Sequence, residues 1–234
     1  MQTNSDLKAQ QCFINGAIFL RKPGAALALI ALLWHSAAVP AWAEDRWYQI
    51  EVIIFQQDGK STEIFDQTES TINWPKNRVE LPEQAINLAM VNSAPPVNSR
   101  LQASDYLLQD IYYQLRRNQN YQPFYHEAWL QKVAENQLSD AVHIVEGPAL
   151  HPRLDGFIRL QRGHYLHVLA DIEYTPVNET IAVATDTQAK EPLIYHLKEK
   201  RRVKFNEVHY LDHPKFGVIV TVKALEFSPA ADDE

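Results

Sequence analysis

Five segments in the second half of the chain alternate apolar and polar residues with the period of a β-strand, and they constrain the fold more than any other feature. The segments are Val142–Glu146, Leu154–Gln161, His164–Tyr174, Leu193–Phe205 and Phe216–Leu225. Because successive side chains of a strand point to opposite faces, this pattern is typical of half-buried strands. Arg162 and Gly163 suit a tight hairpin between the second and third segments, so we predict antiparallel pairing.

The first half of the chain adds two strands and one helix. Trp47–Gln56 is rich in aromatic and β-branched residues and predicts the first strand. Apolar residues recur at helical spacing from Ser99 or Ser104 to Arg117, and Tyr121–Leu130 then returns as a strand. We therefore predict an α+β fold, a mainly antiparallel and curved sheet with one long helix packed on it.

Two stretches lack this periodicity. Residues 58–100 hold four prolines and many small polar residues, which predicts a long irregular connection outside the sheet, with a short helix near Pro82–Met90. A connection of this length is uncommon in a compact domain, so it either packs across the surface, carries a contact or is disordered. Residues 176–192 are expected to form a polar loop, and residues 230–234 an acidic tail that frays.

Residues 1–43 have the pattern of a secretory signal peptide. Arg21 and Lys22 precede an apolar run that ends in Ala41-Trp42-Ala43, which predicts cleavage after Ala43. The run is shorter than the ~20 residues that span a bilayer, although an N-terminal anchor is the alternative. The one cysteine, Cys12, lies in the removed part, so the mature chain is expected to be a soluble periplasmic protein without disulfides and without a membrane anchor.

The mature chain, residues 44–234, is long enough to form a single domain with a sizeable core. Without the leader's three basic residues and one acidic residue it keeps 19 Lys and Arg against 28 Asp and Glu, a net charge of −9. This charge argues against nucleic acid as a partner.

A row of cations stands out against this acidic background. On the strand Leu193–Phe205 one face carries Leu193, Tyr195, Leu197, Val203 and Phe205, and the other face carries the cationic stripe Lys198, Lys200, Arg202 and Lys204. The stripe fits either a solvated edge strand that lysines protect from sheet-to-sheet pairing or a docking surface for an anionic partner or peptidoglycan.

Unusual polar residues follow the stripe, in what the sequence predicts to be the turn of a hairpin. They are Glu207, His209, Tyr210, Asp212, His213, Pro214, Phe216 and Gly217. Pro214 cannot donate to a β-ladder, and Gly217 suits a bulge or a close backbone approach. The adjacent Asp212 and His213 suggest either an oriented general base or, as we prefer, side chains that cap the turn through hydrogen bonds.

Four segments resemble, in order, the CsiV family of periplasmic proteins named for cell shape integrity. The segments are RWYQIEVIIF, YHEAWLQ, LDGFIRLQRGHYLHV and EVHYLDHPKFG, which begin at Arg46, Tyr125, Leu154 and Glu207. The resemblance implies a non-enzymatic factor in cell-wall assembly that binds peptidoglycan. It further implies support of a class A penicillin-binding protein through the outer-membrane lipoprotein activator LpoA. It assigns no binding residues.

The residues themselves leave two function classes open. The chain lacks the serine elbow, the zinc-binding helix and the glycine-rich phosphate loop of common enzymes, and the mature part has no thiol. We therefore expect an interaction protein without cofactor, metal or catalytic residues. The alternative is a wall-active hydrolase or metalloenzyme that uses Asp212 and His213, and bound zinc or muropeptide release would favour it.

Overall fold

The computed structural model describes residues 45–57, 67–91, 93–148, 153–176, 180–183 and 186–227. The signal peptide predicted at residues 1–43 and the acidic tail predicted at residues 230–234 lie outside this part. The elements in it are β1 (Arg46–Gln57), β2 (Arg78–Val79), η1 (Leu88–Met90), η2 (Ala103–Asp105), α2 (Gln109–Arg117), β3 (Tyr121–Val133), β4 (Ala141–Glu146), β5 (Leu154–Arg162), β6 (Leu166–Tyr174), β7 (Thr180–Val183), β8 (Asp186–Pro192), β9 (Tyr195–Val203), β10 (Val208–His213) and β11 (Phe216–Leu225).

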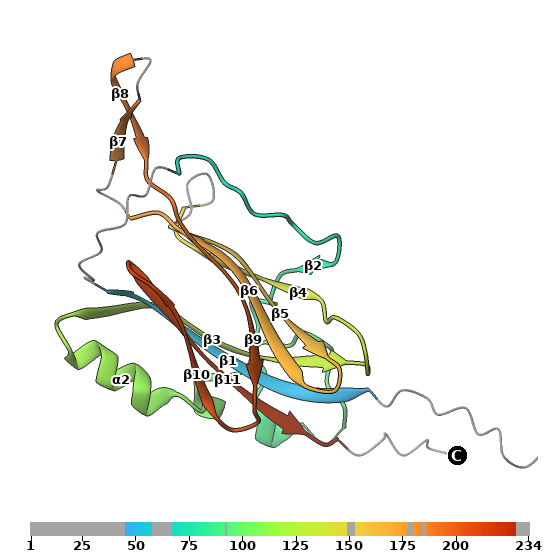
Figure 1. The fold of residues 1–234 in the computed structure, drawn as a ribbon. Coiled ribbons are helices and arrows are strands. Elements are labelled where there is room, and N and C mark those ends of the chain that lie inside the picture. The colour runs from blue at the N-terminus through green and yellow to red at the C-terminus, as the bar shows by residue number, and fades with distance from the viewer. Residues whose placement is uncertain are drawn as a thin grey trace, which may run out of the picture. The chain divides into compact units, whose positions relative to one another are not determined.

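The strands form two main sheets, not the single curved sheet that we predicted (Figure 1). Sheet A has the order β10-β11-β1-β3 and is antiparallel throughout. Sheet B has the order β2-β4-β5-β6-β9, and its pairs are antiparallel except for the short parallel pair of β2 with β4. The predicted hairpin between Leu193–Phe205 and Phe216–Leu225 is therefore wrong, because β9 belongs to sheet B whereas β11 pairs with β10 in sheet A.

The main core lies between the two sheets. Alternate residues of β1 such as Tyr48, Ile50 and Val52 belong to one buried cluster with residues of sheet B such as Ile158 and Ile172. This is the arrangement expected when two sheets pack face to face and each strand turns every second side chain inward. The alternation read from the sequence thus marks the inner face of each sheet.

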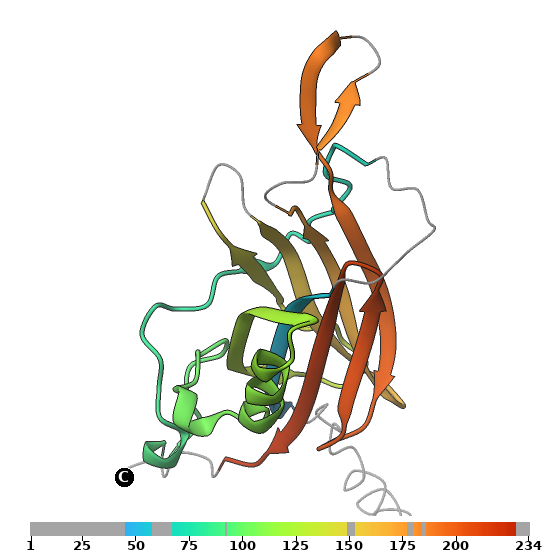
Figure 2. The same cartoon turned by 90° about the vertical axis from the view of Figure 1, so that its left-hand side faces the viewer.

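The outer face of sheet A is covered as well (Figure 2). Helix α2 and its preceding turn place Leu108, Ile111 and Leu115 against Ile53 and Phe55 of β1. A second small cluster around Trp47 and Leu130 packs against the segment from Ile86 to Tyr106. Strand β1 is therefore buried on both faces, which accounts for the apolar run from Val52 to Phe55 and leaves Gln49 and Glu51 as buried polar residues.

The long helix that we predicted from Ser99 or Ser104 is much shorter. Helix α2 ends at Arg117 as predicted but begins only at Gln109. The preceding backbone is engaged elsewhere, since Leu101 N–H donates to the carbonyl of Ala128 and Ser99 accepts from Leu130 N–H, both at the edge of β3. These bonds hold residues 99–101 extended, so the helical spacing of the apolar residues does not decide the backbone conformation there.

The buried carboxylate of Glu51 fixes the start of α2. It accepts hydrogen bonds from the backbone N–H groups of Leu107 and Leu108 and contacts Nε2 of His126 at 2.7 Å. A negative group at a helix N-terminus satisfies donors that have no partner within the helix. His126 on β3 also stacks on the ring of Tyr112 with 4.6 Å between ring centroids.

The two irregular stretches differ from each other in the structure. Within the described part of 58–100, regular structure is limited to β2 and η1 together with two isolated bridge residues, Ile86 and Arg100. The 176–192 stretch, expected as a polar loop, contains the antiparallel strands β7 and β8. β7 has only four residues and the sequence of β8, DTQAKEP, has no apolar alternation, so this pair carries little periodic signal.

None of the helices in the described ranges is both long and apolar enough to cross a membrane.

Candidate functional site

The outer face of sheet B carries most of the cationic stripe. On β9, Tyr195, Leu197 and Val203 are buried in the core, so Lys198, Lys200 and Arg202 point away from it and are exposed. Lys204 follows directly after the end of β9 and is also exposed. The stripe therefore lies along an edge strand of sheet B, because β9 is the last strand in the order of that sheet.

The members of the stripe have different surroundings. Lys198 forms an ion pair of 2.8 Å with Asp171 on the neighbouring strand β6. The guanidinium of Arg202 lies 3.3 Å from the centroid of the Tyr165 ring, and Lys204 pairs with Glu207 at 3.2 Å. No side chain among the described residues pairs with Lys200. Lys200 is therefore the stripe cation with the fewest competing contacts.

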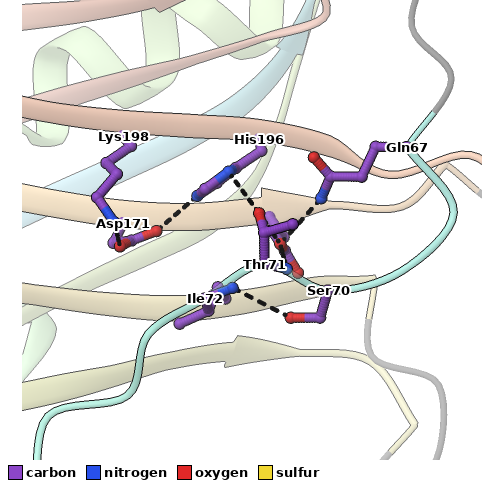
Figure 3. Close-up of polar contacts among 8 residues, drawn as sticks. Gln67, Ser70, Thr71, Ile72, Asp171, His196 and Lys198 are labelled. Carbon is purple, nitrogen blue, oxygen red and sulfur yellow. Dashed lines mark hydrogen bonds and ion pairs between the residues drawn. The ribbon is translucent and has the colours of Figure 1, made fainter.

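Two buried acids on β6 hold a crossing segment against this face (Figure 3). Oε1 of Glu173 accepts hydrogen bonds from Nε2 of Gln67 at 3.0 Å and from the backbone N–H of Thr71 at 2.8 Å. Asp171 contacts Nε2 of His196 at 2.5 Å, and Nδ1 of the same ring lies 3.0 Å from the hydroxyl of Thr71. Buried carboxylates need such partners, so these bonds tie residues 67–71 to β6 and β9.

The tied segment continues into Trp74, which covers the centre of the sheet. Its ring centroid lies 5.9 Å from that of Phe157 on β5 and 5.2 Å from that of His143 on β4, and the guanidinium of Arg78 lies 4.7 Å from the Trp74 ring. His143 is itself bound on both sides by carboxylates, of which Asp155 on β5 is 2.8 Å away. Trp74 is thus fixed between an apolar ring and charged groups.

A groove of about 390 Å³ opens between Trp74 and the stripe. Its walls include two aromatic rings, Trp74 and Phe157, and three cations, Arg159, Lys198 and Lys200, and the acids Asp171 and Glu199 line it as well. We call this site the Trp74 groove. Its volume lies within the range of ligand sites, and its mixture of aromatic surface with a few placed charges is typical of sites that bind polar ligands with apolar faces.

The other half of the stripe borders a different cavity. Arg202 and Lys204 line a pocket of about 630 Å³ at the turn between β5 and β6, together with Arg46 and Arg162. We call this cavity the hairpin pocket. The stripe is therefore not one uniform surface but connects two cavities along the outer side of β9.

The residues predicted to form a turn are mostly a strand. Residues 208–213 form β10, and only Pro214 and Lys215 turn the chain into β11. Phe216 is fully buried, and a Cβ on Gly217 would come within 2.5 Å of the Phe55 ring. At the start of β10, the backbone carbonyl of Glu207 accepts a hydrogen bond from the Thr221 hydroxyl at 3.0 Å. Close contact with neighbouring side chains therefore accounts for the residue types at Phe216 and Gly217.

Asp212 and His213 do not form an acid and imidazole pair. As neighbours on β10 they point to opposite sides: Asp212 is exposed, whereas His213 is buried against the Phe216 ring. Oδ1 of Asp212 accepts from the Tyr210 hydroxyl at 2.5 Å, and Nδ1 of His213 accepts from the Lys215 N–H at 3.2 Å. The geometry gives no support to a general base at this position. His209 binds the backbone N–H of Lys204 at 3.1 Å.

No group of three or more His, Cys, Asp or Glu side chains in the described ranges is placed to hold a metal ion. Sequence reasoning found Lys198 and Lys200 but missed Trp74, Phe157 and Arg159, which complete the Trp74 groove. The available signal was a tryptophan inside an otherwise polar connection, at the run TINWPKN.

A comparison with protein families identifies the family of this chain. The model of the family described as CsiV, peptidoglycan-binding protein, matches residues 26–225, and the chain belongs to this family. The resemblance inferred from the four motifs is thereby confirmed. No curated protein matches the chain. No solved structure matches it either.

Proposed function

We propose that this member of the CsiV family binds peptidoglycan, and that the glycan lies in the Trp74 groove. The observation that supports this most directly is the combination of aromatic rings with cations in one cavity of suitable size. The family description, peptidoglycan-binding, points to the same ligand.

The chemistry of the ligand matches the walls of the groove. Sugar rings present flat faces of C–H groups, which pack well against aromatic side chains such as Trp74 and Phe157. Peptidoglycan also carries carboxylates, and Lys198 and Lys200, which line the same groove, can pair with them. The aromatic wall then supplies apolar contact area and the cationic wall supplies orientation and long-range attraction.

Three further parts of the proposal concern the role of the protein. It acts in the periplasm after removal of residues 1–43, it has no catalytic activity, and it supports a class A penicillin-binding protein through the lipoprotein activator LpoA. The leader pattern of the sequence supports the first part, and the resemblance of the four sequence motifs to the CsiV family implies the other two. The acidic mature chain is compatible with a wall protein that uses a localised cationic surface.

Co-sedimentation with purified sacculi tests glycan binding. Trp74→Ala should lower the bound fraction strongly, whereas Tyr113→Ala, which removes an aromatic ring that is 50% exposed on α2, should not. Lys200→Glu should also weaken binding, with Arg117→Glu on α2 as the matched charge reversal. If both groove variants bind as well as the wild type while they remain folded, the glycan does not lie in the Trp74 groove.

The partner is tested separately. Purified LpoA is mixed with this protein in solution, and the affinity is measured with and without soluble glycan fragments. We expect direct binding that Trp74→Ala leaves intact, because the glycan and the protein partner use different surfaces in this proposal. The absence of any binding under both conditions would remove the partner from the proposal while leaving glycan binding unaffected.

A further inference from the structure

The hairpin pocket differs from the Trp74 groove in its charge. Four cations from three separate segments border it, and two exposed aromatic rings lie beside them. These residues are Arg46, Arg162, Arg202, Lys204, Tyr165 and Phe205. The acids near these cations are fewer, namely Glu135 in the wall and Glu207 paired with Lys204. The cavity therefore carries a positive excess on a chain whose formal net charge is −7.

The fold holds several of these groups in place. An Nη1 of Arg162 donates to the carbonyl of Val133 at 3.3 Å, and Arg202 is seated over the ring of Tyr165. Phe205 stacks on the buried Tyr48 with 5.8 Å between centroids and a 16° angle between the ring planes. Fixed guanidinium groups lose less freedom when they bind an anion, and their planar donors match the geometry of a carboxylate.

Strand β9 connects the pocket to the groove. Lys200 borders the Trp74 groove, and Arg202, two residues further on the same face, borders the hairpin pocket. Successive residues on one face of a strand are separated by about 7 Å. A branched polymer can therefore place its main chain in the groove and a side branch in the pocket without leaving the cationic edge.

We propose that the hairpin pocket binds the acidic peptide that branches from the glycan. This inference rests on the proposed function, and it assigns the carboxylates of the peptide to the Arg46, Arg162, Arg202 and Lys204 group. Glu135 distinguishes a peptide from a phosphate, because a peptide stem also carries a free ammonium group that an exposed carboxylate can pair with. A phosphate ligand would gain nothing from an acid in the wall.

The test uses three probes whose binding to the full chain is measured by calorimetry. They are stem peptide released from sacculi by an amidase, the same peptide with its carboxyl groups amidated, and a neutral N-acetylglucosamine oligosaccharide. We expect the free peptide to bind and the amidated peptide to bind at least about fivefold more weakly, because only the former carries the anions. The neutral oligosaccharide should bind in the groove alone.

Variants separate the two cavities. Arg46→Gln should weaken binding of the free peptide by about fivefold or more and leave the oligosaccharide unaffected. Arg46→Lys, which keeps the charge, should retain part of the affinity. Trp74→Ala should have the reverse effect, with loss of oligosaccharide binding and unchanged peptide binding. Arg202→Gln gives a second pocket variant, and thermal unfolding verifies that each variant is folded.

Several results would overturn the inference. Equal binding of the free and amidated peptides, or unchanged peptide affinity in both Arg46→Gln and Arg202→Gln, would show that the pocket does not recognise carboxylates. Inorganic pyrophosphate serves as a control ligand beside the three probes, and tighter binding of it than of the peptide would assign the pocket to phosphate ligands. Loss of oligosaccharide binding in Trp74→Ala together with no peptide binding at all would retain the proposed function and reject only this inference.

Discussion

His213 should make the protein sensitive to acid, because it is held neutral in the core. Its side chain is 8% exposed and packs against Phe216, and Nδ1 accepts a hydrogen bond from the Lys215 N–H. Burial lowers the pKa of His213 to about 4; the charge of Asp212 opposes this shift, whereas the charges of His196 and Lys215 add to it. A protonated ring at this position would be both buried and deprived of its acceptor role.

The free energy follows from the two pKa values. The unfolded chain takes up the proton at its ordinary pKa of about 6.5, whereas the folded chain takes it up only near pH 4. Between these values the unfolded state binds more protons, so stability is complete above about pH 6.5 and falls as the pH falls. The full loss is about 3 kcal/mol, and about 2 kcal/mol of it is reached at pH 5.

Urea unfolding at pH 7.5 and pH 5.0 measures this loss. His213→Gln removes the titrating ring while its amide oxygen can still accept from the Lys215 N–H. The variant should be less stable at pH 7.5 because it loses ring packing, yet it should lose about 2 kcal/mol less than the wild type on acidification. Other titrating groups, such as His143, whose pKa Asp155 and Glu80 raise against the effect of burial, are common to both proteins. Equal losses in the two proteins would refute the reasoning.

Two further predictions concern the scaffold. Gly156→Ala should lower the free energy of unfolding by about 2–4 kcal/mol, because φ is +154° there and a Cβ would lie 2.6 Å from Cα of Ile172. Gly163→Ala is the control, since its Cβ would meet no atom closer than 3.8 Å, and similar urea midpoints for both would contradict the prediction. Glu51→Gln should cost about 2–4 kcal/mol, because the buried side chain loses one of the two carboxylate oxygens that bind Nε2 of His126 and the backbone N–H groups at the start of α2. An unchanged midpoint for this variant would mean that the carboxylate does not fix the helix.

Much of the secondary structure could be predicted because it follows from local alternation. Phe216–Leu225 has the same bounds in the sequence analysis and in the structure, and Trp47–Gln56 differs from β1 by one residue at each end. Strand pairing could not be predicted in this way. The apolar face of Leu193–Phe205 fits either sheet equally well, and only the complete packing of the core assigns β9 to sheet B.

The short helix shows a second reason why local sequence patterns do not fully predict the structure. Spacing alone predicts an amphipathic helix from Ser99, but hydrogen bonds to β3 and to the Glu51 carboxylate hold the chain out of the helix until Gln109. Tertiary contacts thus override local propensity where a buried acid needs donors. The missed β7 and β8 pair has a different origin, because β7 has only four residues and β8 lacks apolar alternation, so neither gives a clear periodic signal.

The Trp74 groove depends on acids that the sequence presents as ordinary outer-face residues. Asp171 and Glu173 alternate with apolar residues on β6 and would be expected in solvent, yet they are 4% and 5% exposed because residues 67–74 cross over them. The sequence therefore allows a segment to cover these two acids, but only the structure shows that residues 67–74 do so. The polar composition of that segment provides the donors that the acids require.

Asp171 also determines which cation of the stripe is more available to a ligand. Asp171 already holds Lys198 at 2.8 Å, so a ligand carboxylate at Lys198 must compete with a buried carboxylate, whereas Lys200 has no such partner among the described residues. Lys200→Ala should therefore weaken binding to sacculi more than Lys198→Ala, with the larger effect on the association rate and at low salt. Surface plasmon resonance with soluble glycan fragments at two salt concentrations measures both effects. A larger loss for Lys198→Ala at both salt concentrations would show that ligand binding releases Lys198 from Asp171, and the ranking would be wrong.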